Sequence, residues 1–150
     1  MTHLKVGDTA PAITTQTSDN KEFTLELHRG KKIVLYFYPK DNTPGCTAQA
    51  RNLNENLDSL KNQGFEVIGV SPDPLASHLK FIEKFNLKFP LLLDTEKKIA
   101  TDYGVWGEKK NYGKTYFGII RTTFVIDEKG IITEIIEKVD TKNHTKQILR

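Results

Sequence analysis

Cys46 is the only cysteine among the 150 residues, and the residues just before it predict that it lies in the first turn of a helix. Thr43 suits the N-cap, Pro44 suits the first helical position, and Gly45 allows a close approach to the backbone. At a helix N-terminus, the partial positive charge and the unpaired backbone N–H groups favour the thiolate form of a cysteine. A lone cysteine is also commonly an inert, buried apolar residue, so the surrounding sequence must decide between the two interpretations.

The surrounding sequence favours a reactive thiol. Pro39, Thr43 and Cys46 stand in the spacing P-x-x-x-T-x-x-C, which resembles the active-site signature of the peroxiredoxins, thiol peroxidases built on a thioredoxin-like fold. The wider string YFYPKDNTPGCT is similar to the bacterioferritin-comigratory-protein, or Q, type. Further matches cover nearly the whole chain in the same order, namely KVGDTAP at 5–11, VIGVS at 67–71, GVWGEK at 104–109 and RTTFVID at 121–127.

Reduction of a peroxide by a thiol requires an ionised sulfur, a peroxide held in line with it, and donors for the oxygen that leaves. The hydroxyl of Thr43 can turn towards the same pocket as Cys46. The backbone N–H groups of Gly45 and Cys46 are available at the helix start, whereas Pro44 has none. We therefore expect Cys46, as the nucleophile, and Thr43 to be catalytic, and Pro44 and Gly45 to line the substrate pocket.

The resemblance also supplies a cation, because Arg121 matches the active-site arginine of peroxiredoxins. A guanidinium could hydrogen-bond the thiolate and the peroxide together, and a lysine could not reproduce that fork. Without the resemblance, Arg121 would be read as a surface arginine at a strand edge. We expect Pro39 to pack the loop over the cysteine, and Trp106 to line or shield one side of the pocket.

The sequence departs from the family where many Q-type relatives carry a second, resolving cysteine. Five residues after Cys46 the chain has Arg51, and the helix expected over 75–85 contains no cysteine. The resemblance therefore implies a one-cysteine peroxidase, whose sulfenic acid is reduced by an external thiol such as thioredoxin, glutaredoxin or glutathione. Five residues correspond to about 140° around a helix, so Arg51 is expected to point away from Cys46.

Three other functions compete with the peroxidase. A thiol–disulfide oxidoreductase would need Cys-x-x-Cys, and position 49 is Gln. A cysteine hydrolase would need a histidine base beside Cys46. A redox sensor or stress-related binding protein could use the same reactive thiol without turnover, and this is the alternative that the motif leaves open.

The predicted elements that position these residues alternate between strand and helix. Residues 11–25 indicate a hairpin, and the apolar run over 32–38 a central strand covered on both faces. A helix is expected over 44–63, with an apolar stripe at 46, 50, 53, 57 and 60 that places Cys46 on its inward face. The further expected elements are strands over 65–70 and 90–94, helices over 75–85 and 95–103, a long loop over 104–120, a hairpin of 122–126 with 131–139, and a helix over 142–150.

This pattern predicts an α/β sandwich with a mixed sheet. The pattern leaves flavodoxin-like and thioredoxin-like folds equally favoured, and the resemblance selects the thioredoxin-like one. The length suits one domain over 1–150, and the 37% of hydrophobic residues suffice for one core.

Composition argues against several classes of partner. The net charge is only +3 and the basic residues are scattered, so nucleic acid is not an expected partner. No apolar run approaches the roughly 18 residues of a membrane span, and the N-terminus resembles no secretion signal. The four histidines have no metal-ligand spacing, so neither metal nor cofactor is expected. We predict a reduced, cytoplasmic monomer.

Overall fold

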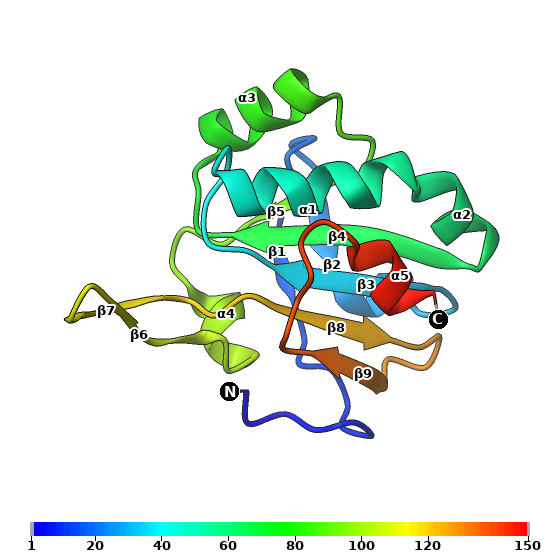
Figure 1. Cartoon of the computed structure of the whole chain (residues 1–150). Coiled ribbons are helices and arrows are strands. Elements are labelled where there is room, and N and C mark those ends of the chain that lie inside the picture. Colours follow the sequence, from blue (N-terminus) through cyan, green and yellow to red (C-terminus); the bar gives the residue numbers. More distant parts are fainter. Residues whose placement is uncertain (1, 150) are drawn as a thin grey trace.

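The computed structural model of the chain describes residues 2–149. Its elements follow one another in the alternating order that the sequence predicts, with helices placed between strands (Figure 1). In chain order they are β1 (Thr14–Gln16), β2 (Glu22–Thr24), the 3-10 helix η1 (Leu25–His28), β3 (Lys32–Phe37), α1 (Pro44–Glu55), α2 (Leu57–Asn62), β4 (Phe65–Ser71), α3 (Leu75–Phe85), β5 (Leu91–Leu93), α4 (Lys98–Asp102), β6 (Trp106–Asn111), β7 (Lys114–Ile119), β8 (Thr122–Ile126), β9 (Ile132–Ile136) and α5 (His144–Ile148).

A five-stranded sheet in the order β5-β4-β3-β8-β9 forms the centre of the molecule. Strands β3, β4 and β5 are parallel, whereas β8 and β9 run antiparallel to their neighbours. β3 lies in the middle because its apolar run can be buried on both faces: Val34 pairs with Val67 on one side and with Val125 on the other. The predicted mixed sheet is confirmed.

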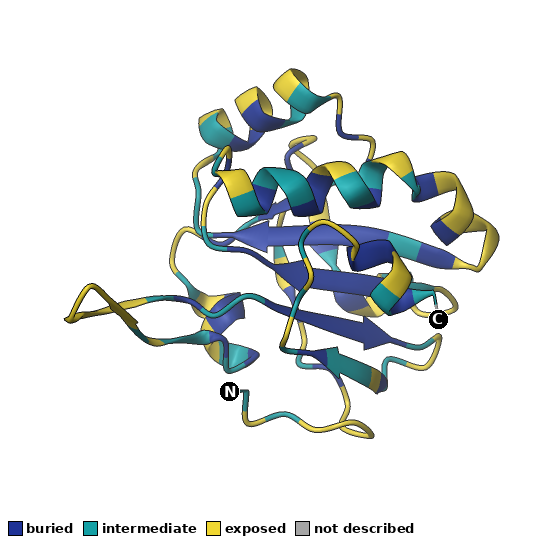
Figure 2. Cartoon of the chain, viewed as in Figure 1, coloured by how far each residue is buried: buried dark blue, intermediate teal, exposed yellow. Residues whose placement is uncertain are grey.

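Each face of the sheet carries its own apolar core, because strand side chains alternate between the two faces. On one face, helices α1, α2, α3 and α5 cover Val34, Tyr36 and their neighbours, and Cys46 belongs to this core. On the other face, the β1–β2 hairpin and α4 cover Leu35 and Phe37. Figure 2 shows the central strands buried between the two layers.

Two predictions about the elements are wrong. Residues 104–120 are not a loop, because β6 and β7 pair antiparallel over Trp106–Asn111 and Lys114–Ile119. The helix expected over 44–63 ends at Glu55 and restarts at Leu57. At the break, the Asn56 side-chain amide donates to the Asn52 carbonyl over 2.8 Å, and side-chain bonding of this kind competes with the helical ladder.

The last predicted helix, over 142–150, is shorter than expected: α5 covers His144–Ile148, and Arg150 lies outside the described residues. Among the described residues, no helix has the length and the apolar character that a membrane crossing would require.

Candidate active site

The chain leaves β3, turns through residues 38–43 and enters α1 at its first turn, which carries Cys46. Thr43 occupies the N-cap with an extended backbone, and Pro44 stands at the first helical position, both as predicted. The Cys46 side chain is only 1% exposed and packs in the core with Tyr36 and Ala50. The sulfur therefore lies at a positive helix end that is shielded from water.

Arg121, the residue just before β8, reaches this sulfur from 75 residues further along the chain. Its Nη2 donates to Cys46 Sγ over 3.4 Å, and its Nη1 donates to Gln49 Oε1 over 2.7 Å. Gln49 is fully buried, so the second bond fixes the plane of the guanidinium. The structure thus brings together Cys46 and Arg121, the two residues that the sequence linked through resemblance alone.

Gln49 was missed by the sequence reasoning, although a signal for it existed. Residues three apart on a helix lie on the same face, so Gln49 had to lie next to Cys46 on α1. The apolar stripe drew attention to Ala50 instead. Gln49 also keeps a buried Nε2 that has no hydrogen-bond partner among the described residues.

Gly45 explains how the guanidinium can approach the helix so closely. A Cβ atom at this position would lie 3.2 Å from Arg121 Nη2, a distance that requires one of the two groups to move. The close approach expected at Gly45 is therefore made by a side chain of the protein itself.

The remaining predicted site residues are placed less directly. The Thr43 hydroxyl donates to the Lys40 carbonyl over 2.8 Å rather than capping the helix. Pro39 is half-buried in the turn after β3. Trp106 packs against the core on the other face of the sheet, with Lys97 Nζ 5.6 Å from its ring centre, so its expected role in lining the pocket stays a prediction.

Two further ionisable groups near Cys46, those of Tyr36 and Lys109, have shifted pKa values. Burial, together with the negative charge at Cys46, raises the pKa of Tyr36 well above its usual value of 10.0, and its hydroxyl is buried without a partner among the described residues. Lys109 of β6 donates to the Ile119 carbonyl over 2.8 Å. Burial and the charge of Arg121 lower the pKa of Lys109, whereas Cys46 acts in the opposite direction.

The comparisons with known proteins agree with this arrangement. The family model of the AhpC/TSA family matches residues 6–135. The chain is 46% identical over 149 residues to a putative peroxiredoxin bcp of Buchnera aphidicola, covering 99% of this chain and 94% of the relative. Peroxiredoxin Bcp of Escherichia coli is 42% identical, with 99% and 96% covered. The chain belongs to the AhpC/TSA family, as a Bcp-type peroxiredoxin.

Solved structures confirm the thioredoxin-like peroxiredoxin fold. The structure resembles PrxQ of Xylella fastidiosa with a TM-score of 0.91 at 32% identity, over 98% of this chain and 94% of that one. Peroxiredoxin Q of Xanthomonas campestris gives a TM-score of 0.87 at 34% identity, over 99% and 94%. Because peroxiredoxins are thiol peroxidases, the activity expected from the motif around Cys46 is established by membership of the family.

Arg51, which stands where many Q-type relatives have a resolving cysteine, points away from the site as expected. It is exposed and lies 3.8 Å from Glu55 on the next turn of α1. With one cysteine in the sequence, this peroxiredoxin cannot close a disulfide within its own chain.

The histidines of this peroxiredoxin do not provide the base that a hydrolase would need. The two buried ones are engaged elsewhere: His78 contacts Asp41 and the Leu92 carbonyl, and His144 contacts Thr123 and Gln147. Within the described part of the chain, the hydrogen-bond donor to the sulfur is Arg121.

One group of metal-binding residue types comes together, and it contains two aspartates with a single histidine. Ligand atoms of Asp41, Asp73 and His78 lie within 4.8 Å of one another. However, these carboxylates already accept hydrogen bonds from the protein, among them those from Tyr38 to Asp41 and from Ser71 to Asp73. The group is a hydrogen-bonded network, and its Asp41 stands in the turn that leads into α1 and Cys46.

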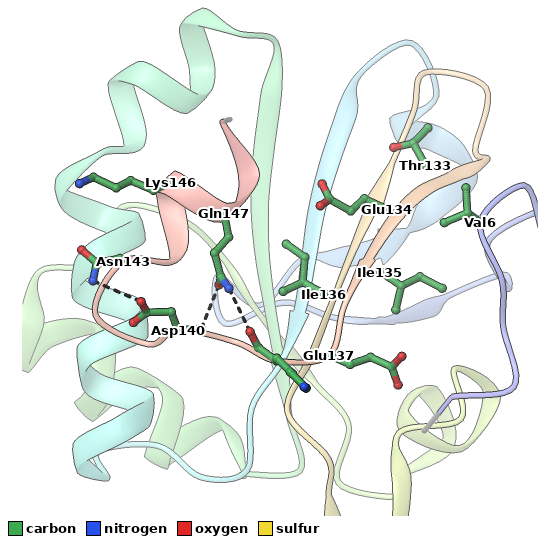
Figure 3. Close-up of a pocket in the computed structure, with 11 residues that line it drawn as sticks. Val6, Thr133, Glu134, Ile135, Ile136, Glu137, Asp140, Asn143, Lys146 and Gln147 are labelled. Carbon is green, nitrogen blue, oxygen red and sulfur yellow. Dashed lines mark hydrogen bonds between the residues drawn. The ribbon is translucent and has the colours of Figure 1, made fainter.

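A broad groove lies on another part of this peroxiredoxin, between β9 and the segment that leads into α5 (Figure 3). Gln147 crosses it, accepting from the Asp140 backbone and donating to the Lys138 carbonyl over 2.9 Å in each case. Its lining residues do not include Cys46, Gln49 or Arg121, so this groove is separate from the reacting sulfur.

Proposed function

We propose that this peroxiredoxin works by a one-cysteine mechanism, in which Cys46 takes an oxygen from the peroxide and an external thiol restores it. The observation that carries the proposal is the pairing of Cys46 Sγ with Arg121 Nη2 at 3.4 Å in a chain that has a single cysteine. The substrates are hydrogen peroxide and organic hydroperoxides.

In the first half-reaction, the Cys46 thiolate attacks one peroxide oxygen, and the O–O bond breaks. The sulfur becomes a sulfenic acid, and the other oxygen leaves as hydroxide or alkoxide and takes up a proton. Arg121 is placed to stabilise the charge that moves from sulfur to oxygen, because its guanidinium has further N–H donors beyond the one on Sγ. Its bond to Gln49 keeps these donors oriented before the reaction begins.

Thr43, Pro44 and Gly45 form the remaining wall of the proposed pocket. The Thr43 hydroxyl has acceptor capacity left while it donates to Lys40, so it can receive a hydrogen bond from a hydroperoxide. Pro39 holds the turn before them, and Trp106 is the proposed outer cover.

In the second half-reaction, an external thiol attacks the sulfenic sulfur, giving a mixed disulfide and water. A second thiol then releases the Cys46 thiolate. Thioredoxin, glutaredoxin and glutathione are the proposed reductants, and we propose a cytoplasmic, single-domain monomer, the compartment resting on the use of a single cysteine.

Stopped-flow kinetics and intact-mass measurement with one equivalent of hydrogen peroxide test the first half-reaction. We expect a fast reaction that adds about 16 Da, one oxygen, that is absent in Cys46→Ser and much slower in Arg121→Ala. Arg51→Ala is the matched control, since Arg51 is an exposed arginine on the far side of α1. A wild-type rate no faster than that of a free thiol would favour a sensor or binding role instead.

The oxidised protein then tests the second half-reaction. Each proposed reductant is added to the isolated sulfenic form, and the mixed disulfide and the return of the thiol are followed by mass. Repeated turnover with one of them supports the one-cysteine cycle. A sulfenic form that none of them discharges, but that forms a lasting complex with another protein, would contradict it.

A further inference from the structure

A buried polar network holds the turn that leads into α1 and Cys46. It ties this turn to the β4–β5 side of β3, whereas Arg121 precedes β8 on the other side of β3. The centre of the network is Asp41, which is 6% exposed and stands in the turn between β3 and α1. The Asp41 carboxylate accepts hydrogen bonds from Tyr38 Oη at 2.6 Å and Ser77 Oγ at 2.8 Å, and its Oδ2 lies 2.7 Å from His78 Nδ1. Burial of a carboxylate is costly unless hydrogen bonds compensate for it. The three partners of Asp41 supply this compensation.

His78 connects this carboxylate to β5, an edge strand of the sheet. The side chain is fully buried in α3, and its Nε2 lies 3.0 Å from the Leu92 carbonyl of β5. Because a carbonyl can only accept, Nε2 carries a proton. The ring is therefore fixed at both nitrogens, between β5 and Asp41.

The backbone of Asp41 is fixed as well. The Asp41 N–H donates to Asp73 Oδ2 over 2.8 Å, and the same oxygen accepts from Ser71 Oγ at the end of β4 over 2.7 Å. The next residue, Asn42, has a φ of +59°, so the chain turns sharply immediately after this anchor and then starts α1. The position of residue 41 consequently sets where the first turn of the helix begins.

We propose that His78 is a positioning residue for the peroxidase reaction, which acts through Asp41 to hold the Cys46 thiolate in line with Arg121. The tolerance at this point is small, since even a Cβ atom added at Gly45 would lie only 3.2 Å from Arg121 Nη2. A displacement of about 1 Å in a reacting group can slow an enzymatic step by roughly a hundredfold. The proposal rests on the peroxidase activity and adds a residue that does not touch the substrate.

Two substitutions of His78 separate positioning from simple stability. The amide nitrogen of Asn can take the place of Nδ1 and that of Gln the place of Nε2, so His78→Asn keeps the contact with Asp41, whereas His78→Gln keeps the contact with Leu92. Each variant loses one buried hydrogen bond, and we expect similar decreases in thermal stability. The rate of Cys46 oxidation by hydrogen peroxide should fall about tenfold or more in His78→Gln and stay within about threefold of wild type in His78→Asn.

Equal rates in the two variants, whether both slow or both unchanged, would overturn the proposal. A wild-type protein that does not react with peroxide would instead refute the one-cysteine function, so the two failures are distinguishable.

A second pair of variants keeps the test open if the His78 variants do not fold. Tyr38→Phe removes a donor to Asp41, and Tyr103→Phe removes a similarly buried hydroxyl that donates to the Pro11 carbonyl in the opposite core over 2.7 Å. The proposal expects slower oxidation of Cys46 in Tyr38→Phe alone. If the two tyrosine variants react equally fast with peroxide, Asp41 does not position the loop and the proposal fails.

Discussion

The Cys46–Arg121 pair is assembled from two segments of opposite character. Cys46 follows β3 and a turn whose root is buried, with Tyr38 fully buried and Asp41 tied to both α3 and the end of β4. Arg121 follows the β6–β7 hairpin, which projects from the body of the molecule (Figure 1) and exposes 98% of Tyr112 and 64% of Phe117.

This difference indicates a division of labour around the sulfur. The buried side fixes the geometry of Cys46 through contacts that also stabilise the fold, so substitutions there are expected to affect both rate and stability. The exposed side borders the approach to Arg121 and holds little of the core, so substitutions there are expected to affect the rate alone. The following predictions test this division, beginning with the junction where the two segments meet.

Arg121→Lys should have the largest effect on the rate. Lysine keeps the positive charge but cannot bond Cys46 and Gln49 at once. Loss of one preorganised donor of this kind typically costs about 100-fold or more, and we expect that decrease in the second-order rate constant with hydrogen peroxide. Arg51→Lys on the outer face of α1 is the control and should react like the wild type. A less than tenfold decrease in Arg121→Lys would show that charge alone suffices.

Gln49→Met should slow the oxidation of Cys46 with little change in stability, unlike other substitutions on the buried side. The substitution keeps the volume and removes a buried amide whose Nε2 has no described partner, so the free energy of unfolding should change by less than about 1 kcal/mol. Arg121 Nη1 loses its acceptor, and the oxidation of Cys46 should slow roughly tenfold. Urea unfolding and stopped-flow kinetics measure the two quantities. The exposed Gln63→Met is the control, and a rate equal to that control would show that Gln49 does not orient the guanidinium.

His144 gives the buried side a dependence on pH. Burial, with a further contribution from Arg121, lowers the pKa of His144 below its usual 6.5, so the folded protein holds a neutral ring between Thr123 and Gln147. The unfolded chain takes up the proton near pH 6.5, ahead of the folded one. Stability is therefore complete above pH 6.5 and declines as the pH falls below it, towards the lowered pKa.

For one proton the slope is at most about 1.4 kcal/mol per pH unit. Urea unfolding of the wild type at several pH values below neutrality should show this decline, and His144→Gln should flatten it. His3→Gln, in the exposed N-terminal segment, should leave the slope unchanged. An undiminished slope in His144→Gln would assign the dependence to other groups.

The same contrast explains what could be predicted from the sequence. Local signals on the buried side were strong: the apolar spacing of α3 predicted Leu75–Phe85 to the residue, and Thr43 with Pro44 marked the start of α1. The β6–β7 hairpin was not predicted from the sequence because its strands are rich in lysine and glycine. In addition, its turn places Tyr112 at a φ of +52°, which non-glycine residues seldom adopt.

Contacts between side chains that are far apart in the sequence were not predicted for a different reason. Asp41 and His78 are 37 residues apart, and Gln49 and Arg121 are 72 apart, so no local periodicity joins them. Only the packing of α3 and β8 around β3 brings these side chains together. Arg121 was identified through family resemblance, because the family motif links residues that are far apart in the sequence. His78 is not part of that motif.

Lys109→Met should have the smallest effect on the rate. It tests most directly whether the exposed hairpin affects the rate without affecting stability. The Lys109 side chain crosses β7, with its Cδ 3.2 Å from where a Cβ on Gly118 would stand, and its ammonium bonds the Ile119 carbonyl two residues before Arg121. Removing this charge should slow the oxidation of Cys46 only about two- to fivefold, and the difference should shrink at high salt because part of the ammonium is exposed to solvent. The free energy of unfolding should change by less than about 0.5 kcal/mol.

Lys110→Met is the matched control, since its side chain leaves the opposite face of the hairpin. Equal effects in the two variants would mean that only the net charge of the hairpin matters, whereas a slower Lys109→Met with unchanged stability would show that the exposed segment tunes the rate without holding the fold.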